Sequence, residues 1–164
     1  LMGGSDEQTT AASEFEILAP VSGELVHLEN TNDPAFSSRA VGDGVAVVPQ
    51  EGTVCAPVSG TVAALFPTEH ALGIMSDDSS AQVMLHIGID TVKLEGKGFH
   101  ALVAQGDHVD AGQPLVEVDF DAVRAAGFDP TVFVIVCERS ENSTLREHAS
   151  GPVAVKEPVV WLSE

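Results

Sequence analysis

Apolar and polar residues alternate with a period of two along most of the chain. Short runs rich in Val, Ile and Leu are interrupted about every ten residues by Gly, Pro, Asp and Ser, a pattern typical of short β-strands joined by turns. The pattern therefore predicts an all-β fold. The expected strands are 15–18, 23–28, 45–48, 60–66, 72–75, 82–87, 114–120, 133–137 and 153–161.

One segment has helical character instead. Asp121 begins a run of Ala, Val and Arg that ends at Gly127, and Pro130 follows soon after. Asp is a favoured helix N-cap, Gly is favoured just beyond the last helical turn, and Pro cannot continue a helix. We expect one short helix over 121–127 and a brief helical turn near 33–36.

The pentapeptide Ala-Pro-Val-Ser-Gly occurs twice, at 19–23 and at 56–60, and a fainter third copy begins at Ser150. In each copy Pro restrains the entry, Gly allows a sharp turn, and an apolar strand follows. Two similar strand–turn–strand units that face one another predict a single β-sandwich or barrel with internal pseudo-symmetry.

The length of the chain indicates the number of domains, and its charge excludes some classes of binding partner. A chain of 164 residues is enough for one domain with a sizeable core. The net charge of −18 repels phosphate backbones and anionic lipid heads, which disfavours nucleic-acid and membrane-surface binding and favours basic partners. The apolar runs are far shorter than the ~20 residues that a membrane-spanning helix needs.

The first residues and the cysteines indicate a cytoplasmic protein. Residues 1–14 lack the cationic start and apolar centre of a signal peptide. We expect them to be a flexible linker or a cloning remnant, and 15–164 to be the folded domain. Cys55 and Cys137 each lie in an apolar stretch, where two free buried thiols in a reducing compartment are a better interpretation than a disulfide.

His86 differs in context from the other five histidines. It lies in the apolar strand expected at 82–87, where desolvation would lower its pKa and keep the imidazole neutral. A neutral ring nitrogen is what a nucleophile or a metal ligand requires. A core histidine bonded to a neighbouring carbonyl is an equally good interpretation at this point.

His70 is a candidate partner for His86. A turn is expected at 77–80, between the two histidines, and a hairpin there could bring their rings side by side. Thr68 lies two residues before His70 and could orient its ring by a hydrogen bond. Taken alone, two histidines at this spacing are a weak signal.

Seven segments in order resemble a known family, the glucose-family IIA phosphocarrier domains of the bacterial phosphoenolpyruvate-dependent sugar phosphotransferase system. The most specific is His-Ile-Gly-Ile-Asp-Thr-Val at 86–92, and the resemblance extends from about 17 to 162. The segments are 19–23, 41–47, 56–60, 68–71, 86–92, 93–99 and 106–112.

This resemblance implies a compact antiparallel β-sandwich and a specific chemistry. His86 would accept a phosphoryl group on Nε2 from the phosphohistidine of HPr and pass it to a cysteine of a IIB domain. His70 would stabilise the phosphate and Thr68 would fix the His70 ring. The chain would then be a phosphotransferase component of sugar uptake with a phosphohistidine intermediate and no required cofactor. It would be a cytoplasmic subunit or a domain tethered within a membrane permease.

The resemblance also implies a surface that meets HPr and IIB around the two histidines. For Val41 and Leu72 we favour an ordinary core position instead, and Asp33 and Asp90 could equally be surface carboxylates or turn caps. The candidates are Asp33, Phe36, Val41, Phe66, Leu72, Met84 and Asp90.

Three alternatives remain open at this point. A regulatory protein-binding domain could share Zn²⁺ with a target protein through His70 and His86, although two histidines leave a zinc site incomplete. A lysostaphin-like zinc hydrolase needs a His-x-His pair, but position 84 is Met. A lipoyl or biotinyl carrier needs a lysine at a hairpin tip, and neither Lys93 nor Lys97 has that setting. The sequence does not name the sugar.

Overall fold

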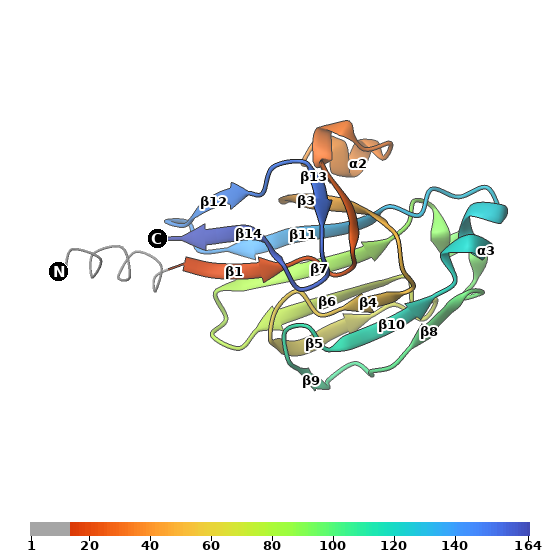
Figure 1. Cartoon of the computed structure of the whole chain (residues 1–164). Helices are drawn as coiled ribbons and strands as arrows, with labels where there is room; N and C mark the ends of the chain where they lie inside the picture. Colours follow the sequence, from red (N-terminus) through yellow and green to blue (C-terminus); the bar gives the residue numbers. More distant parts are fainter. Residues whose placement is uncertain (1–13) are drawn as a thin grey trace.

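The computed structural model describes residues 14–164, and these form three antiparallel sheets (Figure 1). The largest has eight strands in the order β13-β2-β3-β11-β7-β6-β5-β9. Their bounds are β2 Gly23–His27, β3 Asp43–Pro49, β5 Gly60–Leu65, β6 Ala71–Ser76, β7 Ala81–Ile87, β9 His108–Val109, β11 Val132–Arg139 and β13 Gly151–Val153.

The other two sheets have three strands each, in the orders β1-β14-β12 and β4-β10-β8. Their bounds are β1 Glu14–Leu18, β14 Pro158–Ser163, β12 Thr144–Glu147, β4 Thr53–Cys55, β10 Pro114–Val118 and β8 Phe99–Ala101. The helical elements are the α-helices α2 Pro34–Ser37 and α3 Phe120–Ala125, and the 3-10 helices η1 Leu28–Asn30 and η2 Thr91–Leu94.

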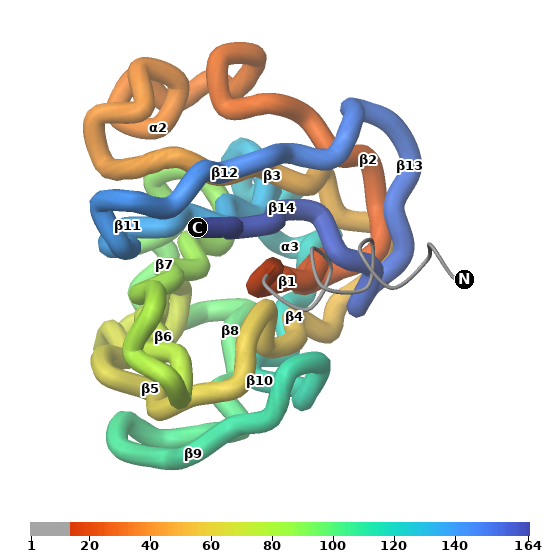
Figure 2. The backbone as a smooth tube through the Cα atoms, turned by 90° about the vertical axis from the view of Figure 1, so that its left-hand side faces the viewer, coloured from red at the N-terminus to blue at the C-terminus, as the bar shows by residue number. Residues whose placement is uncertain are grey.

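The eight-stranded sheet curls around the interior. Figure 2 shows it running from β13 and β2 through β11 and β7 to β5 and β9, with β1 and β4 in the space that it partly encloses. The main core fills this interior and is built almost entirely from aliphatic residues of the alternating strands. The predicted all-β sandwich is confirmed.

A second, smaller core lies on the outer face of the same sheet, beneath α2. Phe36 of α2 packs there with Ala46 of β3 and with Phe133 and Ile135 of β11. Phe133 is fully buried although its neighbours Val132 and Val134 face the main core. The first part of β11 is therefore apolar on both faces, which is why apolar and polar residues do not alternate in its sequence.

The repeated pentapeptides contact each other through equivalent hydrogen bonds. Leu18 N–H donates to Pro57 O at 2.9 Å, and its counterpart Cys55 N–H donates to Pro20 O at 2.7 Å. At the end of the copies, Gly23 begins β2 and Gly60 begins β5. A Cβ at either position would collide with a backbone carbonyl of the neighbouring strand, Val48 O or Met75 O. The internal pseudo-symmetry expected from the sequence is present.

Two later turns extend this relationship. Each turn forms two backbone hydrogen bonds with the Ala that begins one pentapeptide, one to its N–H and one to its carbonyl oxygen. Within each turn, a Gln or Glu side chain accepts a hydrogen bond from a backbone N–H of the same turn. The bonds to the Ala residues are Ala19 N to Glu157 O, Lys156 N to Ala19 O, Ala56 N to Gln113 O and Gly112 N to Ala56 O. Residues 150–157 are thus the counterpart of 106–113 and not a third copy of the pentapeptide.

Some predicted boundaries are wrong. The longer helix begins at Phe120, and its N-cap is Asp119, whose carboxylate accepts from Ala122 N–H at 3.0 Å, and not Asp121. Gly127 follows its last turn in the left-handed region, as expected. The strand expected over 153–161 is two strands, β13 and β14, separated by a turn. The short strands β4, β8, β9 and β12 were not predicted, because runs of two to four residues carry little periodicity.

Cys55 and Cys137 are free, as expected. Of the linker expected at 1–14, all but Glu14 lies outside the described residues, and Glu14 pairs with Ser163 in β14. Across residues 14–164, no helix has the length and apolar character needed to cross a membrane.

Candidate functional site

His86 lies near the end of β7, on the outer face of the large sheet. Val83, Leu85 and Ile87 point into the main core, so the alternation of the strand places Met84 and His86 on the opposite face. The His86 ring packs against Phe36 and Phe133, with ring centroids 5.2 and 6.3 Å away. The small outer core is thus an apolar floor beneath a half-buried imidazole.

The backbone after β7 fixes the protonation of this ring. His86 Nδ1 lies 2.8 Å from the carbonyl oxygen of Gly88. A carbonyl can only accept, so Nδ1 carries the proton and Nε2 keeps its lone pair. Burial lowers the pKa of His86, and the bond to Gly88 together with the charges of Asp33 and Asp90 opposes that shift only in part. The ring is therefore neutral near pH 7.

Gly88 has a conformation that only glycine adopts easily at this point. Its φ is +82°, and a Cβ there would collide with Thr91 Cγ2. Thr91 is fully buried, and its hydroxyl donates to Ile87 O at 2.5 Å. The turn that presents the Gly88 carbonyl to His86 is thus held by a close fit between Gly88 and Thr91.

His70 lies beside His86, at the end of the loop between β5 and β6. Strand β6 ends at Ser76 and β7 begins at Ala81, so the hairpin expected around 77–80 is present. In this hairpin Ala71 pairs with His86. The two imidazole rings meet edge to face, with centroids 5.1 Å apart. The juxtaposition predicted from the sequence is confirmed.

Thr68 contacts the His70 ring at Nδ1. Its hydroxyl lies 2.5 Å from His70 Nδ1. His70 is only 3% exposed, and burial, with a smaller contribution from nearby His86, lowers its pKa. A neutral His70 whose Nδ1 accepts from the Thr68 hydroxyl carries its proton on Nε2 and can donate it to an anion.

The apolar residues expected on the partner surface divide into exposed and buried ones. Phe66 and Val41 are 46% and 39% exposed, and the Phe66 ring stands edge-on to His70 at 5.5 Å. The core position that we favoured for Val41 is therefore wrong. Leu72 is wholly buried in the main core, which confirms the core interpretation for that residue and removes it from the surface.

Phe36 has a different place from the one expected. It is 5% exposed and stacks on Phe133 with ring centroids 4.3 Å apart, so it supports His86 from below and offers little surface to a partner. Met84 is half-buried against the same outer core. Phe133 was not among the predicted site residues, and only the register of β11 against β7, which pairs it with His86, identifies it.

The two acidic candidates occupy the ends of short helical elements. Asp33 caps α2, accepting from Ala35 N–H at 2.9 Å. Asp90 is exposed and precedes η2 with φ +62°. Both carboxylates act on the His86 imidazole through their charge. Asp33 is therefore a cap and also a charge beside the histidine pair.

A zinc site is not supported. His70 and His86 bring two imidazoles together, but the part of the chain from Glu14 onward contains no group of three or more His, Cys, Asp or Glu side chains arranged to hold a metal ion. Two nitrogens fall short of the four ligands of a structural zinc site or the three of a catalytic one.

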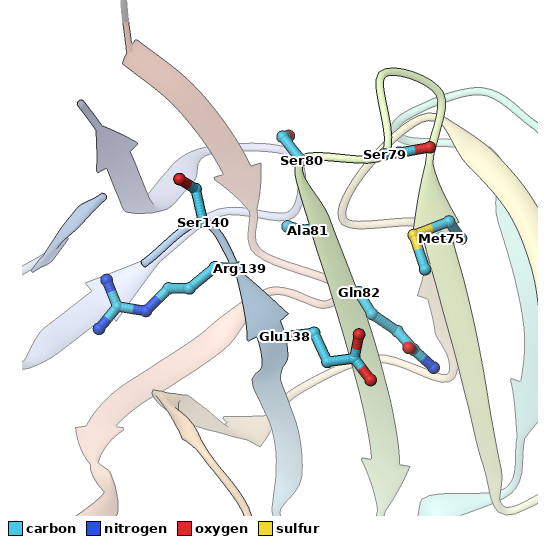
Figure 3. Close-up of a pocket in the computed structure, with 8 residues that line it drawn as sticks. All are labelled: Met75, Ser79, Ser80, Ala81, Gln82, Glu138, Arg139 and Ser140. Atoms are coloured by element: carbon cyan, nitrogen blue, oxygen red, sulfur yellow. The ribbon is translucent and has the colours of Figure 1, made fainter. Parts of the chain in front are cut away.

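A pocket of about 230 Å³ lies apart from the histidines, between the β6–β7 turn and the end of β11 (Figure 3). Glu138 and Gln82 lie together in it, whereas Arg139 points away from them and donates to Ser143 O at 3.0 Å. His86 is at the opposite end of β7. The residues that line the pocket include neither a histidine nor a cysteine, and they are Met75, Ser79, Ser80, Ala81, Gln82, Glu138, Arg139 and Ser140.

Comparison with known proteins agrees with this geometry. Residues 15–142 match the family described as phosphoenolpyruvate-dependent sugar phosphotransferase system, EIIA 1. The chain belongs to this family. The chain is thus a IIA domain of this phosphotransferase system, and the hydrolase and lipoyl-carrier alternatives are set aside.

Individual relatives and a solved structure support the assignment. The IIA domain is 42% identical over 144 residues to the glucose-specific EIICBA component of Streptococcus pneumoniae. The aligned residues make up 88% of this chain and 20% of that protein. It is 40% identical over 161 residues to the beta-glucoside-specific EIIBCA component of Bacillus subtilis. Here the aligned residues make up 98% of this chain and 26% of that protein. The chain therefore spans about a fifth to a quarter of the length of these relatives.

The structural match covers most of both chains. The glucose permease IIA from Mycoplasma capricolum superimposes with a TM-score of 0.83 at 34% identity, and the match covers 90% of this chain and 95% of that one. The IIA domain here and that protein thus share one architecture over nearly their whole lengths.

Proposed function

We propose that His86 is the residue of this IIA domain that carries the phosphoryl group, on Nε2. The observation that carries the proposal is the 2.8 Å contact between His86 Nδ1 and Gly88 O, because it leaves Nε2 as the free nucleophile. The His70 ring stands beside that imidazole, with its centroid 5.1 Å away. One histidine is thus prepared to attack and the other to stabilise.

Two in-line displacements make up the proposed cycle. The Nε2 lone pair of His86 attacks phosphorus of phosphorylated HPr, the P–N bond of HPr breaks, and the electron pair returns to the HPr imidazole. A cysteine thiolate of a IIB domain then attacks the same phosphorus, and the electrons of the broken P–N bond return to His86. Such transfers need positioning and charge stabilisation more than covalent help. A proton on His70 Nε2, with Thr68 holding the ring, would supply that stabilisation.

The proposed partners are HPr and a IIB domain, and they meet the face around the histidine pair. Phe66, Val41 and Met84 give this face apolar contact area, and a flexible methionine suits a surface that serves two partners. Asp33 and Asp90, within a chain of net charge −18, would steer a basic partner toward it.

The sugar is not a property of this site. The curated relatives are named for glucose and for beta-glucosides, although both match most of this chain. We propose that the IIA domain serves sugar uptake in the cytoplasm, in the company of IIB and membrane components that select the sugar. No feature of residues 14–164 favours the regulatory, zinc-sharing alternative over phosphoryl transfer.

Intact mass spectrometry tests the proposal. The wild type is incubated with phosphoenolpyruvate, enzyme I and HPr, beside His86→Gln and the control His108→Gln, which removes an exposed imidazole that pairs with Asp77. We expect one acid-labile phosphoryl group on the wild type and on His108→Gln, and none on His86→Gln. Failure of the wild type to gain the group while HPr is phosphorylated would contradict the proposal.

A further inference from the structure

The loop that presents His70 has an unusual backbone at the residue before it. The loop joins β5 to β6 through Phe66 N–H to Ala71 O at 3.0 Å and a tight turn closed by Glu69 N–H to Phe66 O at 2.8 Å. Glu69 ends this turn with φ +63°, in the left-handed region. Residues other than glycine and asparagine are uncommon there, so the side chain at position 69 needs a reason to be glutamate.

The Glu69 carboxylate ties the loop to a different sheet. Its Oε1 accepts a hydrogen bond from Ala101 N–H. Ala101 ends β8, an edge strand of the β4-β10-β8 sheet, so Glu69 provides an acceptor for an edge donor. Gly96 lies near this loop as well, although not in close contact: a Cβ built there would be 3.8 Å from Thr68 O. The Glu69 side chain therefore ties this loop to the 96–101 segment.

We propose that Glu69 is a positioning residue for His70. It lies between Thr68 and His70, whose side chains meet at 2.5 Å, and its bond to Ala101 holds the strained backbone that lets them meet. The charged carboxylate makes this a strong anchor. The part of this inference that concerns phosphoryl transfer rests on the proposed function of His86 and His70.

Three variants separate this role from general stability. Glu69→Gly removes the anchor but adopts the same φ freely, and Glu69→Gln keeps an oxygen that accepts from Ala101 N–H. The control is Ser79→Gly, which makes the same kind of replacement at φ +59° in the β6–β7 turn. Thermal unfolding of each variant shows whether the fold is retained.

Two readouts report on His70. The first is its ring nitrogen spectrum by NMR, which reports the tautomer and needs no phosphoryl transfer. The second is the rate of phosphoryl exchange between HPr and the chain. For Glu69→Gly we expect a change in the His70 signals and a rate lower by roughly tenfold to 10²-fold, the cost of misplacing a reacting group. Glu69→Gln and Ser79→Gly should keep the His70 signals and most of the rate.

The outcomes distinguish this inference from the proposed function. If the wild type accepts no phosphoryl group, the proposed function fails, and an altered His70 spectrum in Glu69→Gly alone supports the positioning role. If the wild type is phosphorylated and Glu69→Gly matches it in spectrum or in rate, Glu69 is only an edge cap for β8 and the inference is overturned. An equal effect in Ser79→Gly would overturn it as well.

Discussion

The carbonyl oxygen of Gly88 lies 2.8 Å from Nδ1 of His86, two residues earlier in the chain. This bond decides which ring nitrogen holds the proton, and the apolar floor of Phe36 and Phe133 decides that the other nitrogen stays unprotonated. A backbone turn and a small outer core thus prepare the same imidazole in two separate ways.

The first prediction concerns titration of the histidines. Burial lowers the pKa of both His86 and His70, whereas the hydrogen bond and charge of Asp77 raise the pKa of exposed His108. In an NMR titration we expect His86 and His70 to have midpoints below the ordinary imidazole value of about 6.5 and His108 to have one above it. His86 should show the Nδ1–H tautomer on the neutral side. A midpoint for His86 above that of His108 would contradict the site geometry.

The same shifts give stability a pH dependence. Because the folded pKa of His86 and of His70 is lowered, the unfolded chain takes up protons first as the pH falls below about 6.5, and the folded state loses stability in that window. Replacing His86 with Gln should flatten the fall in the free energy of unfolding between neutral pH and the lowered folded pKa. Denaturant unfolding at several pH values measures this, and an unchanged slope would argue against a buried neutral ring.

A third prediction concerns the turn after β7. In Gly88→Ala the positive φ alone costs about 1–2 kcal/mol, and the added Cβ collides with Thr91 Cγ2. We expect a loss of stability of at least this size and a displaced carbonyl, so that the His86 tautomers mix and phosphorylation slows. Combining the change with Thr91→Ser, which removes Cγ2 and keeps the hydroxyl bond to Ile87 O, should restore part of both losses. No rescue would mean that the collision is unimportant.

Replacing the His70 ring by one without nitrogen tests its proposed role. His70→Phe keeps a planar ring against Phe66 and His86 but removes the donor. In the proposed cycle, HPr would still contribute to stabilising the phosphoryl group during loading, whereas on the loaded chain His70 would be its neighbouring donor. We expect donation to a IIB cysteine to slow by roughly 10²-fold, the usual cost of one lost charge-stabilising donor, and loading to slow less. Rapid-quench measurement of both steps checks this, and equal effects would contradict it.

The repeated glycines predict a matched pair of destabilised variants. A Cβ at Gly23 or Gly60 would meet a backbone carbonyl of the adjoining strand, which cannot move aside easily. Each Gly→Ala change should cost about 1–3 kcal/mol or more in the free energy of unfolding. Gly73→Ala is the control, since its Cβ would meet only Gln82 Nε2 at 3.8 Å. Chemical denaturation compares the three, and a similar cost at all three would show that strand glycines are simply intolerant of substitution.

Much of this fold can be predicted from the sequence because most strands bury one face only. Alternation from Gln82 to Ile87 identifies β7, and the repeated Ala-Pro-Val-Ser-Gly identifies the paired units. The helix boundary could not be set from sequence, since Asp119 and Asp121 are both good caps and only the structure shows that Asp119 accepts from Ala122 N–H.

The site was predictable in its histidines but not in what surrounds them. His86, His70 and Thr68 lie in recognisable strings. Phe133 becomes part of the site only through the pairing of β11 with β7, which no local pattern contains. Glu69 was missed for a similar reason, because its partner Ala101 lies in another sheet and the contact depends on how two sheets are placed.

The reciprocal bonds between Leu18, Pro57, Cys55 and Pro20 make the seam between the two units resemble the interface of a twofold dimer, fused into one chain. In such an interface each unit both donates a hydrogen bond to the other unit and accepts one from it. A change in one pentapeptide therefore also weakens the bond that its copy receives, and changes in both should cost less than the sum of the single changes. The two units pack as the subunits of a homodimer do, but they belong to one chain and can therefore differ in sequence. The histidine pair lies on the outer face of the large sheet, away from that seam.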